Sequence, residues 1–214
     1  MNALLDFLST RRAQLAVDSW QHVSATVQAV LLATALSLVV GVAVYRSRAG
    51  SAVATGLAST ALTVPSFALL GLLIPVFGLG VVPTMVALVI YAVLPILRNT
   101  IVGLDAVPAA TIDAARGVGM SRSAVLRRVE LPLAWPSILA GIRVSTQMSM
   151  GILAIAAYAK GPGLGNLIFA GLSRVGTPTA VPMALTATVL IVVLALVLDG
   201  LLVLLGRLTA RGIS

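Results

Sequence analysis

Three long stretches of the sequence contain no charged residue at all: residues 19–45, 49–97 and 175–198. A fourth stretch, 131–159, contains only Arg143. A helix that crosses a bilayer needs about 20 mainly apolar residues, so these stretches predict membrane-spanning helices. The runs are continuously apolar rather than alternating with a period of two, which disfavours a β-barrel. The chain is therefore predicted to be an all-α integral membrane protein.

The composition excludes the soluble classes. Only 9% of the 214 residues are charged and 59% are hydrophobic, whereas a soluble domain carries about 25% charged residues. The net charge of +8 would suggest nucleic acid in a soluble chain, but in a membrane protein arginines mark cytoplasmic loops, so no nucleic-acid partner is expected. The chain has no cysteine, and its single histidine, His22, has no ligand cluster, so no metal site is expected.

Five spans are expected. The stretch 49–97 is long enough for two helices, and Gly78 and Gly80, flanked by prolines, mark the break between them. The spans are predicted at about 24–45, 51–74, 83–103, 134–157 and 181–206. Together they form a transmembrane domain over 23–211, with a long connecting loop at 104–133. Residues 1–22, which mix leucines with charged side chains, are expected to form a separate interfacial segment on the lipid bilayer.

The basic residues predict the orientation. With the N-terminus outside and the C-terminus inside, the cytoplasmic side receives Arg46, Arg48, Arg98, Arg116, Arg122, Arg127, Arg128, Arg207 and Arg211. The outer side then receives only Arg11, Arg12, Lys160 and Arg174. The positive-inside rule therefore favours an N-out, C-in chain, a multi-pass protein of a bacterial or archaeal cytoplasmic (inner) membrane.

The loop between the third and fourth spans carries helix start and stop signals. Thr111 can cap a helix over 112–118, and Gly119 can adopt positive φ and end it. Ser121 can cap a second short helix through about Val129, and Pro132 is expected to block its continuation. Met120, Val125, Leu126 and Val129 would give this pair an apolar stripe, and Arg122, Arg127 and Arg128 a positive rim. The alternative is an amphipathic loop helix lying on the membrane surface.

The same loop contains a spaced motif: Asp113-Ala114-Ala115, three residues, Gly119, nine residues, then Val129-Glu130-Leu131-Pro132. This resembles the EAA signature of ABC-importer permeases, Glu-Ala-Ala, three residues, Gly, nine residues, Ile-x-Leu-Pro. Asp113 stands for the Glu and Val129 for the Ile. The resemblance implies the five-helix core of a type I importer permease and a cytoplasmic coupling helix that docks on an ABC ATPase subunit. The residues implied at that contact are Asp113, Ala114, Ala115, Gly119, Met120, Ser121, Arg122, Leu126, Val129, Leu131 and Pro132.

Further segments resemble the glycine betaine, carnitine and choline permease subfamily: 63–70, 74–78, 94–100, Gly141-Ile142-Arg143, and Gly161-Pro162-Gly163-Leu164-Gly165. The resemblance implies the permease subunit of an ATP-driven importer for osmoprotectants. It also implies a second permease copy or homologue and an extracytoplasmic substrate-binding protein. The chain has no Gly-x-x-x-x-Gly-Lys-Ser/Thr loop, so ATP is expected on the partner subunit, with no cofactor and no catalytic residue here. The alternatives are another small organic solute, or a membrane scaffold that binds a cytoplasmic partner.

Two charged residues fall deep inside predicted spans, whereas Arg98 lies nearer the interface. Arg143 and Asp199 lie at similar depth from the cytoplasmic ends of the fourth and fifth spans, which predicts an ion pair with a structural or a gating role. Prolines, polar residues and one phenylalanine in the central spans are candidates for the translocation pathway, or alternatively for helix packing. They are Pro65, Ser66, Phe67, Pro95, Thr146, Gln147 and Ser149. Only Phe67, Phe77 and Tyr91 among the aromatics lie in or beside the central spans, so a high-affinity aromatic cage is not expected.

Overall fold

The computed structural model describes residues 2–210 and the side chains of residues 7–209, and every regular element in that range is helical. Residue 1 of the expected N-terminal segment, and Arg211 at the end of the expected transmembrane domain, lie outside the described residues. The elements are α1 (Asn2–Val44), α2 (Arg48–Thr63), α3 (Ser66–Phe77), α4 (Val81–Asp105), α5 (Ala109–Gly117), α6 (Arg122–Val125), the π-helical turn η1 (Leu126–Glu130), α7 (Leu131–Ala156), the 3₁₀ turn η2 (Ala157–Ala159), α8 (Gly165–Leu172) and α9 (Ala180–Ala210).

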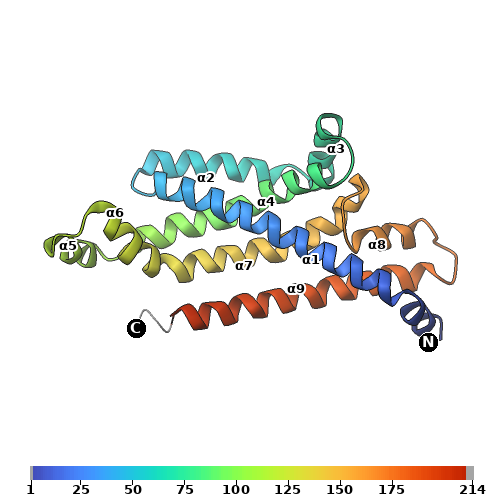
Figure 1. Cartoon of the computed structure of the whole chain (residues 1–214). Helices are drawn as coiled ribbons and strands as arrows, with labels where there is room; N and C mark the ends of the chain where they lie inside the picture. Colours follow the sequence, from blue (N-terminus) through green and yellow to red (C-terminus); the bar gives the residue numbers. More distant parts are fainter. Residues whose placement is uncertain (1, 211–214) are drawn as a thin grey trace.

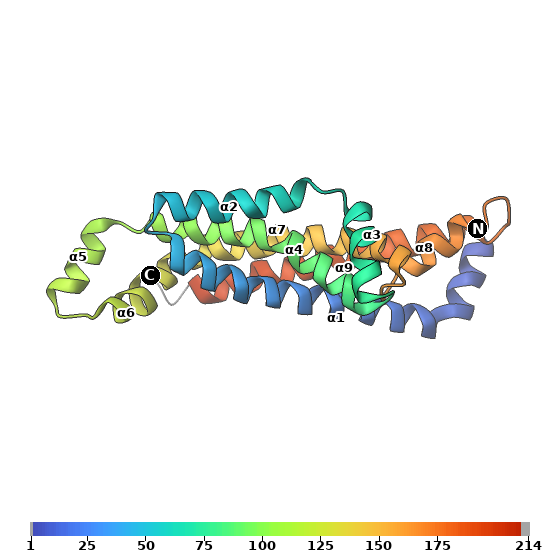
Figure 2. The same cartoon turned by 90° about the horizontal axis from the view of Figure 1, so that it is seen from above.

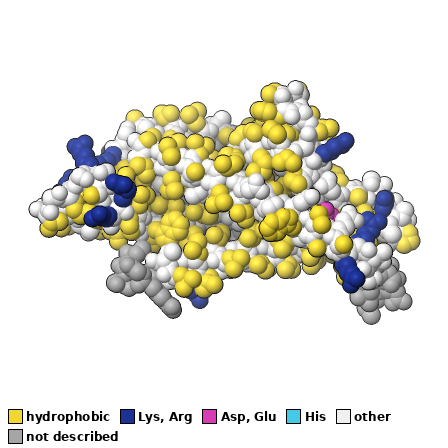
Figure 3. All heavy atoms as spheres, in the orientation of Figure 1, with side chains coloured by type: hydrophobic (Ala, Val, Ile, Leu, Met, Phe, Trp, Pro, Cys, Tyr) yellow, Lys and Arg dark blue, Asp and Glu magenta, His cyan; other side chains and the backbone are white. Residues whose placement is uncertain are grey.

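The long helices α1, α2, α4, α7 and α9 run side by side, as Figures 1 and 2 show from two directions. The short helices α5 and α6 lie at one end of this bundle, and α8 and the N-terminus lie at the other. Four described segments are long and apolar enough to cross a membrane, and α2 with α3 makes a fifth if the bent pair counts as one span. Lys and Arg side chains gather at the two ends, with a largely hydrophobic band between them (Figure 3). The predicted all-α membrane fold is confirmed.

The span expected over 51–74 is not one straight helix. Between α2 and α3 the chain bends by 94°. Pro65 causes the break, because its ring removes a backbone donor and disfavours helical geometry at the preceding residue. Val64 is accordingly extended, at φ −69° and ψ 125°. The Val64 carbonyl that the break leaves free accepts a 2.6 Å hydrogen bond from the Tyr91 hydroxyl on α4.

No helix break separates residues 1–22 from the first span. Within the described residues α1 continues from Asn2 to Val44, 43 residues or about 65 Å, roughly twice the hydrocarbon thickness of a bilayer. Phe7 and Leu15 on its first half are buried in a cluster with Leu164 and Leu167 of the α8 region and with Met183 of α9. The first half of α1 is therefore held by the α8 end of the bundle, and its position relative to the bilayer stays a prediction.

Small residues allow α4 and α7 to approach closely. A Cβ added to Gly103 would lie 2.8 Å from the Ser137 Cβ, and one added to Gly141 would lie 2.7 Å from the Pro95 carbonyl oxygen. The Ser145 hydroxyl donates to the Ala92 carbonyl across the same interface at 2.7 Å. Small residues and serine hydroxyls are the usual means of packing membrane helices. The α4–α7 pair is the centre of the bundle, against which α1 and α9 also pack.

Pro132 does not end the helix before it, contrary to the expectation from the sequence. The chain continues in helical geometry from Arg122 to Ala159 without a break in the backbone path. The turn before the proline widens into the π-helix η1, in which the Leu131 N–H donates to the Leu126 carbonyl five residues back. A π-turn changes the hydrogen-bond pattern where the proline ring would otherwise clash with a carbonyl. One continuous helix therefore joins α6 to α7.

Candidate functional site

The first helix of the loop between α4 and α7 ends in a specific glycine turn. Gly119 has φ +85°. Its N–H donates to the Arg116 carbonyl at 2.9 Å, and the Met120 N–H donates to the Ala115 carbonyl at 3.1 Å. These two bonds form a Schellman motif, which requires a left-handed residue at the Gly119 position. The predicted positive φ of the motif glycine is confirmed.

The starts of the two short helices agree with the sequence only in part. Ser121 caps α6, with its side chain accepting from the Ala124 N–H at 3.3 Å, as predicted. The expected cap at Thr111 is wrong, because α5 begins at Ala109, three residues before the predicted start at 112. Pro108 precedes that helix with φ −60° and sets its start. We call residues 109–125, the two helices α5 and α6 with the turn between them, the knob.

The apolar side chains of the knob mostly face inward. Val125 is only 1% exposed, and Leu126 packs against the bundle cluster that contains Ala134 and Ile138. Val129, Leu131 and Pro132 are half-buried at the base of α7, and Ala115 is buried beneath α5. These side chains fix the knob to the bundle. They do not form an outward stripe.

The tip of the knob is open to solvent. Asp113, Ala114, Gly119, Ser121 and Arg122 are all exposed, and Met120 is half-buried. Val118 is 81% exposed although it is apolar, and the sequence analysis did not select it. Its position inside the motif, between two glycines, was the available signal. The tip therefore offers a small apolar contact inside a polar rim.

A buried carboxylate lies at the junction between the knob and α7, and the sequence analysis missed its role. Glu130 is 1% exposed and accepts hydrogen bonds from the Tyr45 hydroxyl at 3.0 Å and from Arg46 Nη2 at 3.0 and 3.2 Å. The hydrogen bond to Glu130 raises the pKa of Arg46. Burial is the main cause that raises the pKa of Tyr45, and the hydrogen bond to Glu130 is the second. The three groups hold the turn after α1 against η1.

The two charged residues inside the spans lie in contact. Arg143 Nε lies 2.8 Å from Asp199 Oδ1, and Arg143 Nη2 lies 2.8 Å from Asp199 Oδ2. This is the bidentate arrangement that planar guanidinium and carboxylate groups favour. Gln147, one helical turn further along α7, lies next to the same carboxylate. The pair connects α7 with α9, each of which belongs to a candidate membrane span.

The residues selected for a translocation pathway do not share one surface of the described chain. Pro65 and Phe67 are exposed and Ser66 half-buried at the corner between α2 and α3. Thr146 and Ser149 are buried between helices, and the Thr146 hydroxyl donates to the Ile142 carbonyl of its own helix. Pro95 is half-buried, with its carbonyl against Gly141, and Gln147 is exposed beside the ion pair. Pro65, Phe67 and Gln147 are the members of this set that are exposed, and Gln147 lies away from the corner.

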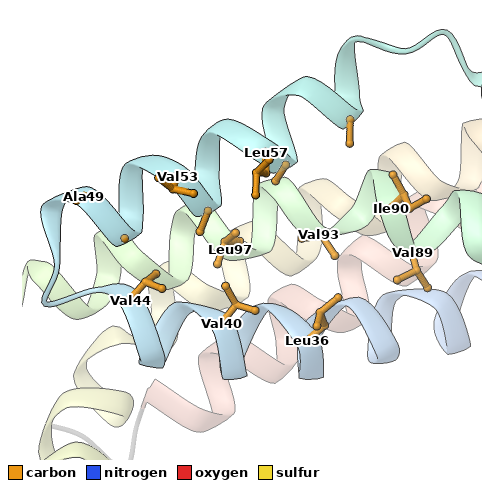
Figure 4. A pocket seen from close by; sticks show the side chains of 14 residues that line it. Leu36, Val40, Val44, Ala49, Val53, Leu57, Val89, Ile90, Val93 and Leu97 are labelled. Atoms are coloured by element: carbon orange, nitrogen blue, oxygen red, sulfur yellow. The ribbon is translucent and has the colours of Figure 1, made fainter.

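An apolar groove lies between α2 and the pair α1 and α4. Its volume is about 720 Å³, and α2 contributes no buried residue to the bundle. Figure 4 shows side chains such as Val53 and Leu57 of α2 pointing toward Val40 of α1 and Val93 of α4. A small polar solute needs a few convergent polar groups, and this lining has almost none. The groove is therefore not the recognition site for such a solute.

Known proteins share this architecture. A chain of the MetNI methionine ABC transporter, solved in inward-facing conformations, superimposes with a TM-score of 0.79 over 94% of this chain and 98% of the other, at 21% sequence identity. That likeness shows the fold. The family model described as binding-protein-dependent transport system inner membrane component matches residues 26–211. The chain belongs to this family.

Relatives of this inner membrane component are curated as permease proteins. The choline transport system permease protein OpuBB of Bacillus subtilis (strain 168) is 37% identical over 198 residues, which cover 92% of this chain and 91% of the relative. The glycine betaine/carnitine/choline transport system permease protein OpuCB of the same organism matches with the same identity and coverage. The family match begins at Thr26, inside α1, and includes the knob and the ion pair. The predicted family is confirmed.

Proposed function

We propose that this permease is the membrane subunit of an ATP-driven importer for osmoprotectants of the quaternary ammonium class, such as glycine betaine, choline or carnitine. The support is the kinship to two permeases named for these solutes, each aligned over nine-tenths of both chains. The chain itself supplies helices, a coupling surface and a path. It hydrolyses nothing, and ATP binds to a separate ATPase subunit.

The knob is the docking element for that ATPase, and its geometry is the observation that carries the proposal. The Schellman turn at Gly119 and the cap at Ser121 give the tip one conformation, with Val118 and Arg122 exposed around it. An exposed apolar side chain in a polar rim is the arrangement that a protein partner covers. A loop helix lying flat on the bilayer is disfavoured, because the apolar side chains of the loop other than Val118 are largely turned into the bundle.

Movement of the ATPase is passed to the membrane through α6, η1 and α7. These form one continuous helical path from Arg122 to Ala156. Because no loop interrupts this path, a displacement of the tip moves α7 as well. Close packing at Gly141 passes the motion to α4, and the Arg143–Asp199 pair passes it to α9. A helical path that shifts as a unit between two packings is how domain motions are commonly transmitted.

Two further partners belong to this proposal. A second permease, identical or homologous, encloses the path with this one, and a substrate-binding protein delivers the solute at the outer face. The exposed corner at Pro65, Ser66 and Phe67 lines the outer part of that path. The orientation is N-out and C-in, which places the knob in the cytoplasm and the α8 end outside.

Single-cysteine labelling tests the orientation directly, because the chain has no cysteine of its own. Val118→Cys at the knob and Val175→Cys after α8 are matched probes, at 81% and 79% exposure. In intact cells that express the permease without its ATPase, a membrane-impermeant maleimide should label the residue at 175 and spare the one at 118, and permeabilised cells should label both. The reverse pattern would overturn the orientation.

Uptake tests the function. Vesicles contain the permease with the ATPase and the binding protein encoded beside it, and labelled glycine betaine, choline and carnitine are supplied with and without ATP on the ATPase side. ATP-dependent accumulation of any of them supports the proposal. If none accumulates while the binding protein still stimulates ATP hydrolysis, the importer stands and its solute is another small organic molecule. If no ATPase associates, the scaffold alternative replaces the importer.

A further inference from the structure

Three aromatic rings from distant parts of the chain meet at the α2–α3 corner. The ring centroids of Phe67 and Tyr158 lie 5.3 Å apart with an interplanar angle of 68°, and those of Phe67 and Phe169 lie 6.5 Å apart at 69°. Phe67 lies in the first turn of α3, Tyr158 lies in η2, and Phe169 lies in α8. Phe67 is 47% exposed and Tyr158 is 57% exposed. We call these three residues the aromatic corner.

The elements that carry the rings are held in place by hydrogen bonds. Tyr91 fixes the start of α3 through the Val64 carbonyl, next to Phe67. The Gly80 N–H, at the end of the turn after α3, donates to the Ala159 carbonyl in η2 at 2.7 Å, directly after Tyr158. Two ring-bearing elements are thus tied to each other as well as to the bundle. The ring positions are preorganised.

The glycine-rich segment 161–165 holds the third ring. Its carbonyls at Gly161 and Gly163 accept from the Asn166 side chain at 2.8 and 3.1 Å. Gly163, with φ +99°, lies so close to His22 that an added Cβ would be 2.8 Å from Nδ1. The segment therefore packs directly against α1 and fixes the start of α8, which carries Phe169. The Gly-Pro-Gly sequence serves close packing here, and a phosphate loop is not formed.

Rings in this arrangement suit one chemical class of ligand. A quaternary ammonium group has no N–H to donate, so it is recognised by the negative faces of aromatic rings within about 6 Å. The edge-to-face packing leaves ring surface open on Phe67 and Tyr158. Among the described residues, the two guanidinium groups that lie over rings are those of Arg11 and Arg46, far from this corner in sequence and placed on Phe7 and Tyr45. No cation of the described chain already occupies these faces.

We infer that the aromatic corner is a low-affinity entry site for the quaternary ammonium group of the transported solute. This inference rests on the proposed function. The site receives the cationic head as the solute leaves the binding protein and passes it toward the path beside α3. Partial exposure keeps the affinity low, because a cation–π contact at an exposed site contributes only about 0.5–1 kcal/mol. Low affinity is what a site needs if the solute is to leave it again.

The sequence predicts no high-affinity aromatic cage, because only Phe67, Phe77 and Tyr91 lie in or beside the predicted central spans. Tyr158 and Phe169 lie outside those spans. The chain bends by 94° between α2 and α3, and Phe67 in the first turn of α3 lies next to Tyr158 of η2 and Phe169 of α8. The site exists only because that bend brings three separate segments together.

The experiment uses the complete importer in liposomes: permease, ATPase and binding protein. Phe67→Leu and Tyr158→Leu keep apolar bulk and remove the ring face, and Tyr158→Phe keeps the face. Phe77→Leu is the matched control, because Phe77 lies on the same helix at 46% exposure and belongs to no ring pair of the described chain. Each Leu variant at the corner should lower the initial uptake rate of labelled glycine betaine or choline by about two- to fivefold. Tyr158→Phe should lose less uptake than Tyr158→Leu, because it keeps the ring face, and Phe77→Leu should stay near the wild-type rate.

Stimulation of ATP hydrolysis by the loaded binding protein is measured in the same liposomes and should be retained in every variant. Wild-type uptake in both corner Leu variants would overturn the inference, and so would an equal loss in Phe77→Leu. Loss of the stimulation would assign the corner to docking of the binding protein and would also overturn it. If the wild-type importer itself takes up no quaternary ammonium solute, the proposed function fails instead, and that result is seen before any variant is compared.

A second measurement separates ring electrons from ring shape. Phe67 is replaced by phenylalanines carrying one, two and three fluorine atoms, which withdraw electron density from the ring face at almost constant size. The uptake rate should fall stepwise with each added fluorine if the face attracts a cation. An unchanged rate across the series would show that Phe67 acts only by shape, and the inference would be wrong.

Discussion

The guanidinium of Arg46 lies 3.0 Å from the carboxylate of Glu130, so that the turn after α1 is joined to the π-helical turn that precedes α7. Glu130 is 1% exposed, and a carboxylate removed from water needs charged and hydrogen-bonding partners. Arg46 supplies the charge, and the Tyr45 hydroxyl supplies a second bond at 3.0 Å. The motif position between Val129 and Leu131 is thus the anchor of the helix that carries the knob.

Loss of that anchor should destabilise the protein. Arg46→Gln leaves the Glu130 carboxylate buried without its counter-charge. We expect this to lower the free energy of unfolding by about 1–2 kcal/mol, which is less than for a fully buried ion pair because Arg46 is half exposed. The control is Arg48→Gln, because Arg48 is exposed nearby and forms no ion pair with any described residue. Thermal unfolding in detergent should show a lower Tm for Arg46→Gln alone. Equal Tm values for the two variants would contradict the anchoring role.

The two glycines of the knob should respond differently to alanine. Gly119 has φ +85°, so Gly119→Ala strains the turn by about 1–2 kcal/mol even though an added Cβ would meet open space. Gly117 is the control, because it is helical and its added Cβ also meets nothing. Gly117→Ala should be neutral or stabilising, since alanine favours the helix by about 1 kcal/mol. We expect ATP-dependent uptake and ATPase association to fall in Gly119→Ala and to persist in Gly117→Ala.

If both alanine variants kept full uptake, the conformation of the knob tip would be irrelevant to coupling. If both lost it, the effect would follow from crowding at the partner surface. Only the asymmetric result supports a role for the left-handed turn itself.

Exchanging the two charges of the Arg143–Asp199 pair should restore stability that either single substitution removes. Asp199→Asn leaves the Arg143 guanidinium without its carboxylate at membrane depth, where an unpaired charge is costly. We expect this variant and Arg143→Gln to lower the yield of folded protein and its Tm in detergent. The exchange Arg143→Asp with Asp199→Arg restores opposite charges at both positions and should recover much of the loss. An exchange variant no more stable than the single variants would show that the contact contributes little.

Even one added methyl group at the α4–α7 interface should lower the stability of the protein. In Gly141→Ala the new Cβ would meet the Pro95 carbonyl oxygen at 2.7 Å, so the helices must separate, at a cost of about 1–3 kcal/mol. Gly151 lies on the same helix with open space at its Cβ position. Gly151→Ala should therefore leave the Tm unchanged or raise it. Similar Tm values for the two variants would place the close approach elsewhere on α7.

Local signals in the sequence predicted local structure well. The charge-free stretches predict the long helices, and Gly119 and Ser121 predict the turn inside the knob, because each depends on neighbours within a few residues. Proline was harder to interpret. Pro65 breaks a span, whereas the helix continues through Pro132 by way of a π-turn. At the first break the Tyr91 hydroxyl of α4 donates to the freed Val64 carbonyl, and at the second the Leu131 N–H donates to the Leu126 carbonyl within the helix.

The sequence by itself determined that this chain is a helical membrane protein, which family it resembles and where its coupling motif lies, because hydropathy and motif spacing are properties of contiguous residues. Only the tertiary structure decided what meets across the bundle. Glu130 binds Arg46, which lies 84 positions away in the chain, and Phe67 contacts Tyr158 next to the 94° bend between α2 and α3. Such contacts depend on how helices pack and turn, and the spacing of residues along the chain carries little information about either.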